Sequence, residues 1–213
     1  MVFVGIHHFN EGIRAQLMDS LEVQLLLSGV QNIPRAEVET RARPQRTRLN
    51  SYFSSLEELC LLTLARGLYR WTKEIEEAVS TRITREEFAL ILAEQAAERL
   101  PILRLMGADL TCLADKSAPD IIALYQRIED GFFAALRFAL QSLSRPYPPD
   151  RAILLAEGIY INFCGVANMC TTSAELQFAR LRANSKRRHR SLKAATLTAL
   201  CITLTLPFPE ETA

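Results

Sequence analysis

The sequence predicts an all-α protein. Apolar residues recur at helical spacing along most of the 213-residue chain. The pattern Ser/Thr-x-x-Glu, in which a hydroxyl and a carboxylate cap the first turn of a helix, occurs at Ser55, Thr84 and Thr172. The stretches between these segments are short and rich in turn residues, which leaves little room for a sheet.

The composition indicates an ordinary globular chain, with 49% hydrophobic and 23% charged residues. A formal net charge of +1 gives no overall basic character, so any nucleic-acid signal must come from local clustering. The opening MVFVGIHHFNEG lacks the basic start and long apolar run of a signal peptide. No stretch reaches the roughly 18 apolar residues of a membrane span. We therefore expect a cytoplasmic protein without membrane association.

Residue types that carry chemistry are scattered. The five cysteines form no C-x-x-C pair and lie far from the histidines, which predicts buried free thiols and no metal site. Glycine-rich phosphate loops, G-x-S-x-G and H-E-x-x-H are absent, so we expect neither an enzyme nor a bound cofactor. Acidic pairs such as Glu57-Glu58 are explained by helix capping.

The helices follow from periodicity and caps, taken in order. Ile13, Leu17, Leu21 and Leu25 form an i+4 series that ends at a glycine C-cap, Gly29. Pro101 interrupts the apolar pattern of the middle region, and the segment 144–150 is the clearest loop. Beyond two short helices within 33–53, the predicted helices cover about 11–28, 55–79, 84–100, 102–113, 119–143 and 150–169, with another starting at Thr172.

The last part of the chain is ambiguous. Residues 180–193 hold seven basic residues and no acid, and ATLTALCITLTL then alternates in a way that is also typical of a strand. Length and helical context favour a helix that ends before Pro207. The basic cluster at 186–190 is either a solvated helix end or a contact for DNA or an acidic partner.

Residues 33–59 predict two short helices, a tight break between them, and the start of a longer helix. Val38 and Ala42 face inward from the first helix. Leu49, Phe53 and Leu56 follow at i, i+4 and i+7, which places them on one helical stripe. The opposite face is polar and basic, because four arginines without an acid lie within eight positions: Arg41, Arg43, Arg46 and Arg48. Such a pair of helices is typical of a helix-turn-helix that enters a DNA groove.

These residues resemble the TetR family of transcriptional regulators over about 21–65. The resemblance rests on the helix that ends at Gly29, on Ile33 and Ala36-Glu37-Val38, and on the ending Leu49, Tyr52, Phe53, Ser55, Glu57, Glu58 and Leu59. It implies a DNA-binding domain, 1–66, and a helical ligand-binding and dimerisation domain, 67–213. The last two long helices would form a homodimer, and a ligand would change the spacing of two recognition helices on a double-stranded operator, with repression as the family default.

The resemblance implies that residues 45–53 form the recognition helix in the major groove. The arginines can neutralise phosphates or fork onto guanine, and Asn50 or Gln45 can pair with adenine. The sequence leaves open which arginine does which. The residues expected at the DNA are Arg41, Arg43, Gln45, Arg46, Thr47, Arg48, Asn50 and Ser51.

The turn departs from the family pattern, because Arg43-Pro44 stands where glycine is usual. An extended Arg43 at the N-cap with Pro44 as the first helical residue is the consistent alternative. Pro34 and Asn50 also replace the usual capping hydroxyl and phosphate-contacting tyrosine. These departures keep open a second function, a helical ligand-binding or dimerisation protein whose DNA binding is weakened or lost.

The larger half has the composition of an apolar ligand pocket, for a small and largely apolar molecule. Asn162 and Asp109 are candidate polar anchors. Residues of these types are more often plain core than pocket lining. The candidate lining residues are Trp71, Phe88, Met106, Tyr125, Phe132, Phe133, Tyr160 and Phe163.

Overall fold

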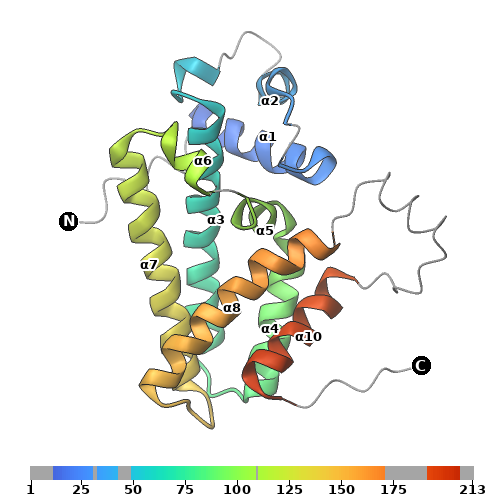
Figure 1. Cartoon of the computed structure of the whole chain (residues 1–213), viewed down its shortest axis with the longest axis vertical. Helices are drawn as coiled ribbons and strands as arrows, with labels where there is room; N and C mark the ends of the chain where they lie inside the picture. The colour runs from blue at the N-terminus through green and yellow to red at the C-terminus, as the bar shows by residue number, and fades with distance from the viewer. Residues whose placement is uncertain (1–11, 31–32, 43–48, 109, 171–190, 207–213) are drawn as a thin grey trace, which may run out of the picture. The chain divides into compact units, whose positions relative to one another are not determined.

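The computed structural model describes residues 12–30, 33–42, 49–108, 110–170 and 191–206 (Figure 1). Within these ranges every regular element is a helix, which confirms the all-α prediction. The predicted helix start at Thr172, the basic cluster 186–190 and the Arg43-Pro44 turn lie outside the described residues. The elements are α1 (Gly12–Ser28), α2 (Arg35–Ala42), η2 (Leu49–Ser51), α3 (Leu56–Ala78), α4 (Arg85–Glu98), α5 (Leu100–Met106), α6 (Leu110–Asp115), α7 (Pro119–Ser142), α8 (Pro149–Cys170) and α10 (Leu192–Leu204).

Most predicted bounds hold to within a residue or two, and two details differ from expectation. The helical run breaks next to Pro101 as predicted, but slightly earlier: α4 ends at Glu98, and Pro101 lies in the first turn of α5, where a missing N–H costs nothing. The helix predicted to reach about Leu113 is two short ones, α5 and α6. The ambiguous ATLTALCITLTL segment is helical, with Ser191 Oγ accepting the Ala194 amide as N-cap and Thr205 left-handed as C-cap.

The chain forms two compact units. The first contains Met1–Glu74 and Leu100–Ala135, and the second contains Ile75–Arg99 and Leu136–Ala213. Helices α3 and α7 each contribute residues to both units. This division is by packing, and the functional division into 1–66 and 67–213 stays a prediction.

The core of the first unit is built on α1, which packs against α2 and α5. Its predicted apolar stripe is fully buried at Leu17, Leu21 and Leu25. The C-terminus of α1 is closed as predicted by Gly29, whose φ of +73° is the left-handed conformation that glycine adopts cheaply. The Arg104 guanidinium of α5 donates to the Leu25 carbonyl, which caps the same helix end from outside.

Helices α3 and α5 approach each other closely at Gly67. A Cβ atom at this position would lie 2.4 Å from Ile102 Cδ1 and 2.6 Å from its Cγ1. Because several atoms of the isoleucine would collide, only glycine fits without displacing the Ile102 side chain. Further along α3, the rings of Trp71 and Phe132 pack with centroids 5.3 Å apart.

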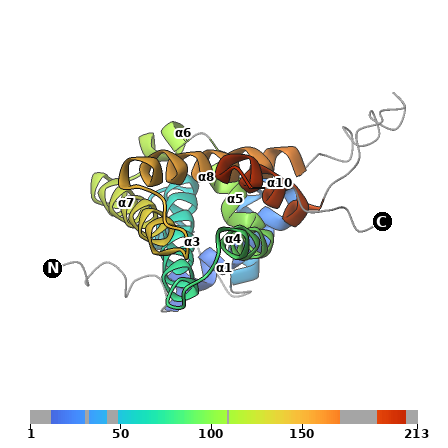
Figure 2. The ribbon, with the colours of Figure 1, turned by 90° about the horizontal axis from the view of Figure 1, so that it is seen from below.

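In the second unit α10 packs against α4 and α8, and Figures 1 and 2 show these helices side by side. Asn162 of α8 donates to Thr203 Oγ1 of α10 at 2.5 Å, so this candidate polar anchor fastens two helices together. Tyr147 donates to the Leu204 carbonyl at 2.9 Å, beneath the Arg85 guanidinium, which lies 3.7 Å from its ring centroid. Burial is the largest influence on this hydroxyl and raises the pKa of Tyr147.

The cysteines follow the prediction in part. Cys60 and Cys201 are buried, and burial raises the pKa of the Cys60 thiol to about 12. Cys112 is exposed on α6, contrary to expectation, because α6 is too short to bury more than Leu113. Each described helix is too short or too polar to traverse a lipid bilayer.

Candidate nucleic-acid interface

The predicted helix-turn-helix begins with α2, which packs on α1 through a single fully buried residue, Val38. Ser20 of α1 donates to the Val38 carbonyl at 2.8 Å, which fixes the two helices in register. Pro34 precedes the helix, and its carbonyl accepts the amides of Glu37 (2.9 Å) and Val38 (3.3 Å). Backbone bonding thus replaces the hydroxyl cap that Pro34 lacks.

Only the end of the expected recognition helix is described, as the short 3₁₀ turn η2. The Leu49 carbonyl accepts the amides of Tyr52 and Phe53, and the side chains of Leu49 and Phe53 are buried. The chain then leaves the helix, so the single stripe through Leu56 is wrong. The reason is the cap at Ser55, whose Oγ accepts the Glu58 amide at 2.9 Å and starts α3 as a separate helix.

The predicted DNA-facing residues divide into two groups. Arg41, Asn50 and Ser51 are exposed, as a contact with DNA requires. Arg43, Gln45, Arg46, Thr47 and Arg48 lie outside the described residues. The assignment of all eight to DNA stays a prediction.

Two residues that the sequence reasoning missed join α2 to η2. Arg35 Nη2 donates to Asn50 Oδ1 at 2.5 Å, and Arg35 Nε pairs with Glu39 at 3.1 Å. The same Glu39 carboxylate accepts the Leu49 amide at 2.9 Å. An i, i+4 arginine–glutamate pair on the polar face of α2 was the available signal. These bonds hold α2 and η2 together.

The start of α3 is hydrogen-bonded to the connection between α6 and α7. Ser55 Oγ donates to the Lys116 carbonyl at 2.9 Å, and Lys116 Nζ donates to Glu57 at 2.5 Å. The Lys116 hydrogen bond holds the pKa of the Glu57 carboxyl below its ordinary value. The predicted capping box is half formed, because the Glu58 carboxylate instead accepts a hydrogen bond from Ser54 Oγ.

A buried arginine joins α3 to α1. The Arg66 side chain is 1% exposed and pairs with Glu22 at 2.5 Å and Asp19 at 2.7 Å. A mid-helix arginine within an otherwise apolar face was the sequence signal for this contact. The ion pairs anchor the first helix of the predicted DNA-binding element on the long helix behind it.

Replacing Arg66 by methionine is expected to lower the free energy of unfolding by about 3 kcal/mol. Removing one partner of a buried ion pair costs about 3–5 kcal/mol, and the lower end applies because the Asp19 side chain is 64% exposed and can be hydrated. Urea unfolding measures this change. The matched control is Arg82→Met, an exposed arginine between α3 and α4. Equal stability of both variants would contradict the anchoring role of Arg66.

The candidate ligand-pocket residues are distributed over both units. Trp71, Met106, Tyr125, Phe132 and Phe133 belong to the first unit, and Phe88, Tyr160 and Phe163 belong to the second. Phe133 and Tyr160 are half-buried, and the others are buried as core residues are. Their role in ligand binding stays a prediction.

The described elements define an all-α protein in which two short N-terminal helices precede longer packed helices. Its structure is similar to that of the transcriptional regulator FadR from Bacillus subtilis in complex with stearoyl-CoA. The TM-score is 0.55 at 12% sequence identity, and the match covers 90% of this chain and 97% of that chain. The two proteins therefore share a fold. Neither a protein-family model nor a curated protein sequence matches this chain.

Proposed function

We propose that this chain is a ligand-responsive, DNA-binding transcriptional regulator of the TetR type. The observation that carries the proposal is the shared fold with a transcriptional regulator over 90% of this chain. The N-terminal residues that resemble the TetR family support the same function independently. The protein acts in the cytoplasm on a double-stranded operator, by default as a repressor.

The DNA contact has two physical components. Arg41, Arg43, Arg46 and Arg48 neutralise phosphates and release counterions, which provides affinity without sequence preference. A guanidinium fork on guanine, or Gln45 or Asn50 on adenine, provides specificity. Asn50 can pair with adenine only after it breaks its 2.5 Å hydrogen bond with Arg35. This contact therefore favours the second function, a helical protein with weakened DNA binding.

The proposed ligand is small and largely apolar. The regulator of the same fold was crystallised with stearoyl-CoA, a molecule with a long apolar chain. Aromatic candidates for such a pocket within the first unit include Trp71 and Phe132. A ligand that binds another conformation more tightly than the DNA-bound conformation shifts the protein away from the operator. The size of this shift is set by the difference between the ligand's affinities for the two conformations.

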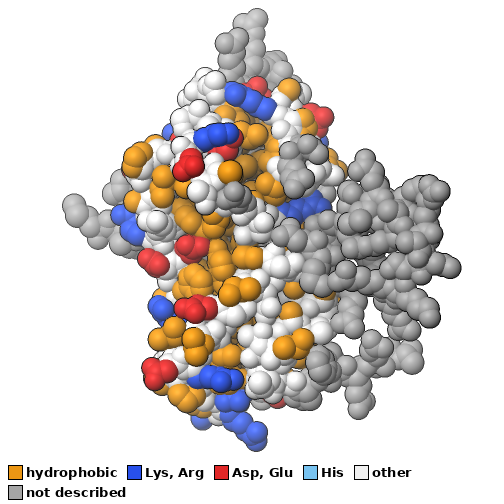
Figure 3. All heavy atoms as spheres, viewed as in Figure 1, with side chains coloured by type: hydrophobic (Ala, Val, Ile, Leu, Met, Phe, Trp, Pro, Cys, Tyr) orange, Lys and Arg blue, Asp and Glu red, His pale blue; other side chains and the backbone are white. Residues whose placement is uncertain are grey.

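We propose a homodimer that buries the outer faces of α8 and α10. Leu154 and Ile161 of α8 are 65% and 68% exposed, and Ile202 of α10 is 63% exposed. Figure 3 shows hydrophobic side chains on the surface where these two helices lie. Large aliphatic side chains left exposed on neighbouring helices are typical of an interface with a second copy.

The double variant Leu154→Arg, Ile161→Arg is expected to be a folded monomer. In a dimer, the two introduced arginines would be buried in the interface and would face the same two arginines of the second copy. Light scattering coupled to size exclusion measures the mass. Leu90→Arg, on the exposed face of α4, is the control and should remain dimeric. A dimeric double variant would contradict this interface.

The proposed function is tested by selecting fragments of the host genome that the protein retains, with and without metabolite extract. A regulator is expected to enrich one or a few fragments with two half-sites, and to release them when its ligand is present. The logarithm of its affinity should fall with the logarithm of salt concentration with a slope of about −3 or steeper. The absence of any enriched fragment would favour the second function.

A further inference from the structure

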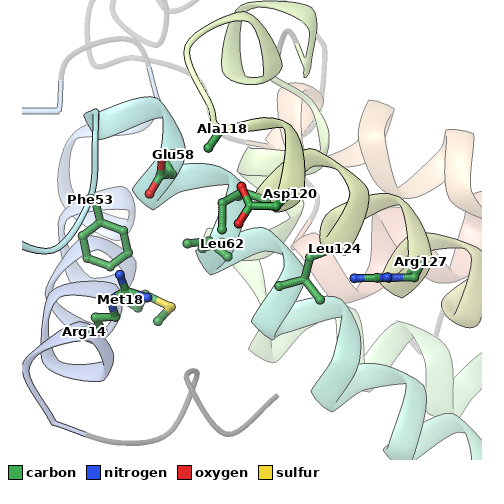
Figure 4. Close-up of a pocket in the computed structure, with 10 residues that line it drawn as sticks. Arg14, Met18, Phe53, Glu58, Leu62, Ala118, Asp120, Leu124 and Arg127 are labelled. Atoms are coloured by element: carbon green, nitrogen blue, oxygen red, sulfur yellow. The ribbon is translucent and has the colours of Figure 1, made fainter. Parts of the chain in front are cut away.

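A cavity of about 390 Å³ lies in the first unit, between α1, the segment before α3, and the start of α7 (Figure 4). This volume is at the lower end of the range for pockets that take small molecules. Much of the lining is apolar, from Met18, Phe53, Leu62, Ile121 and Leu124. None of the residues predicted from the sequence to bind a ligand or DNA lines it.

Two carboxylates face this cavity. Glu58, at the start of α3, is only 6% exposed, whereas Asp120 is exposed in the first turn of α7. In Figure 4 both carboxylates lie along the same edge of the pocket. Among the described residues neither has an ion-pair partner, and Glu58 accepts only the Ser54 hydroxyl. A carboxylate buried without a cation is unfavourable, so a cation that enters the cavity gains from pairing with it.

The two arginines of the lining do not neutralise this edge. The Arg14 guanidinium lies over the Phe53 ring, 5.6 Å from its centroid. Arg127 is exposed and follows Asp120 by seven residues, about two helical turns or 10 Å along α7. In Figure 4 Arg14 lies beside Phe53 on one side of the pocket, and Arg127 lies on the other side, further along α7.

We propose that this cavity binds a small organic cation whose ammonium group contacts Glu58 and Asp120. The apolar body of the ligand packs on Leu62, Ile121 and Leu124. A primary amine joined to one ring by a short alkyl chain fits both the volume and the charge. This proposal does not depend on the proposed DNA binding, since its test measures only the binding of small molecules to the cavity.

The test compares three probes of the same size on the full chain: 4-phenylbutylamine, 4-phenylbutanol and 4-phenylbutanoate. Isothermal titration calorimetry at pH 7 measures each Kd. The amine is expected to bind at least tenfold more tightly than the alcohol, which lacks the charge, and the carboxylate more weakly still. Equal binding of the amine and the alcohol would overturn the proposal. Tighter binding of the carboxylate would assign the cavity to an anion held by the arginines.

Two variants locate the cation. Glu58→Gln keeps the acceptor for Ser54 and removes the charge, and it is expected to weaken amine binding about tenfold while leaving the alcohol unchanged. Asp120→Asn is on the surface, so it tests the same charge without risk to folding, with an expected loss of three- to tenfold. Asp130→Asn, an exposed acid on α7 outside the lining, is the control. Unchanged amine binding in both pocket variants would contradict the site.

Discussion

The variant Phe53→Asp is expected to be largely unfolded at 37 °C. Phe53 is 2% exposed, and truncating a buried phenylalanine costs about 3–5 kcal/mol before the charge is counted. Burying a carboxylate adds several kcal/mol. The neighbouring Arg14 is half-exposed, so a new ion pair with it returns only about 1 kcal/mol. Because domains are stable by roughly 5–15 kcal/mol, little stability would remain.

Thermal unfolding followed by circular dichroism measures this effect. Phe53→Leu is the matched control, since an apolar residue of similar size is expected to cost less than about 1.5 kcal/mol. If Phe53→Asp melts at the wild-type temperature, the described burial of Phe53 between α1 and α3 is wrong.

The double variant Arg46→Ala, Arg48→Ala is expected to weaken operator binding by at least about 30-fold while the protein stays folded and dimeric. Each arginine at a phosphate or base edge contributes roughly 1–3 kcal/mol. The slope of affinity against salt should also become less steep, by about one unit for each phosphate that the variant no longer neutralises. Fluorescence anisotropy on the fragment selected from the genome, at several salt concentrations, measures both quantities.

The control for this variant is Arg82→Ala, an exposed arginine between α3 and α4. It removes one positive charge from the second unit and should leave the affinity and the salt slope near their wild-type values. Unchanged binding by the double variant to the same fragment would reject the docking of residues 45–53 in the groove.

Local patterns predicted local structure well. The i+4 leucines of α1, the Thr84 capping box of α4 and the left-handed Gly29 all form within one or two turns of the chain, so the sequence window contains both partners. Prediction failed where two local signals competed. The spacing of Leu49, Phe53 and Leu56 favoured one continuous helix, whereas the Ser55 cap favoured a new helix. In the structure Ser55 Oγ accepts the Glu58 amide, so the new helix forms.

The candidate site was predicted only in outline. The exposure of Arg41, Asn50 and Ser51 follows from helical periodicity alone. The contact of Arg35 with Asn50 spans 15 positions, and no periodicity encodes it. The cavity beside Phe53 joins residues from α1, α3 and α7, and nothing in their spacing brings them together.

The sequence by itself therefore determined that this chain is all helical, where most helices begin and end, and which N-terminal residues resemble a DNA-reading element. Only the tertiary structure decided the contacts that join these helices. Arg66 reaches Glu22 over 44 positions, and Ser55 reaches Lys116 over 61. Helix formation depends on neighbours within a turn, whereas these pairings depend on how whole helices pack, which no local window contains.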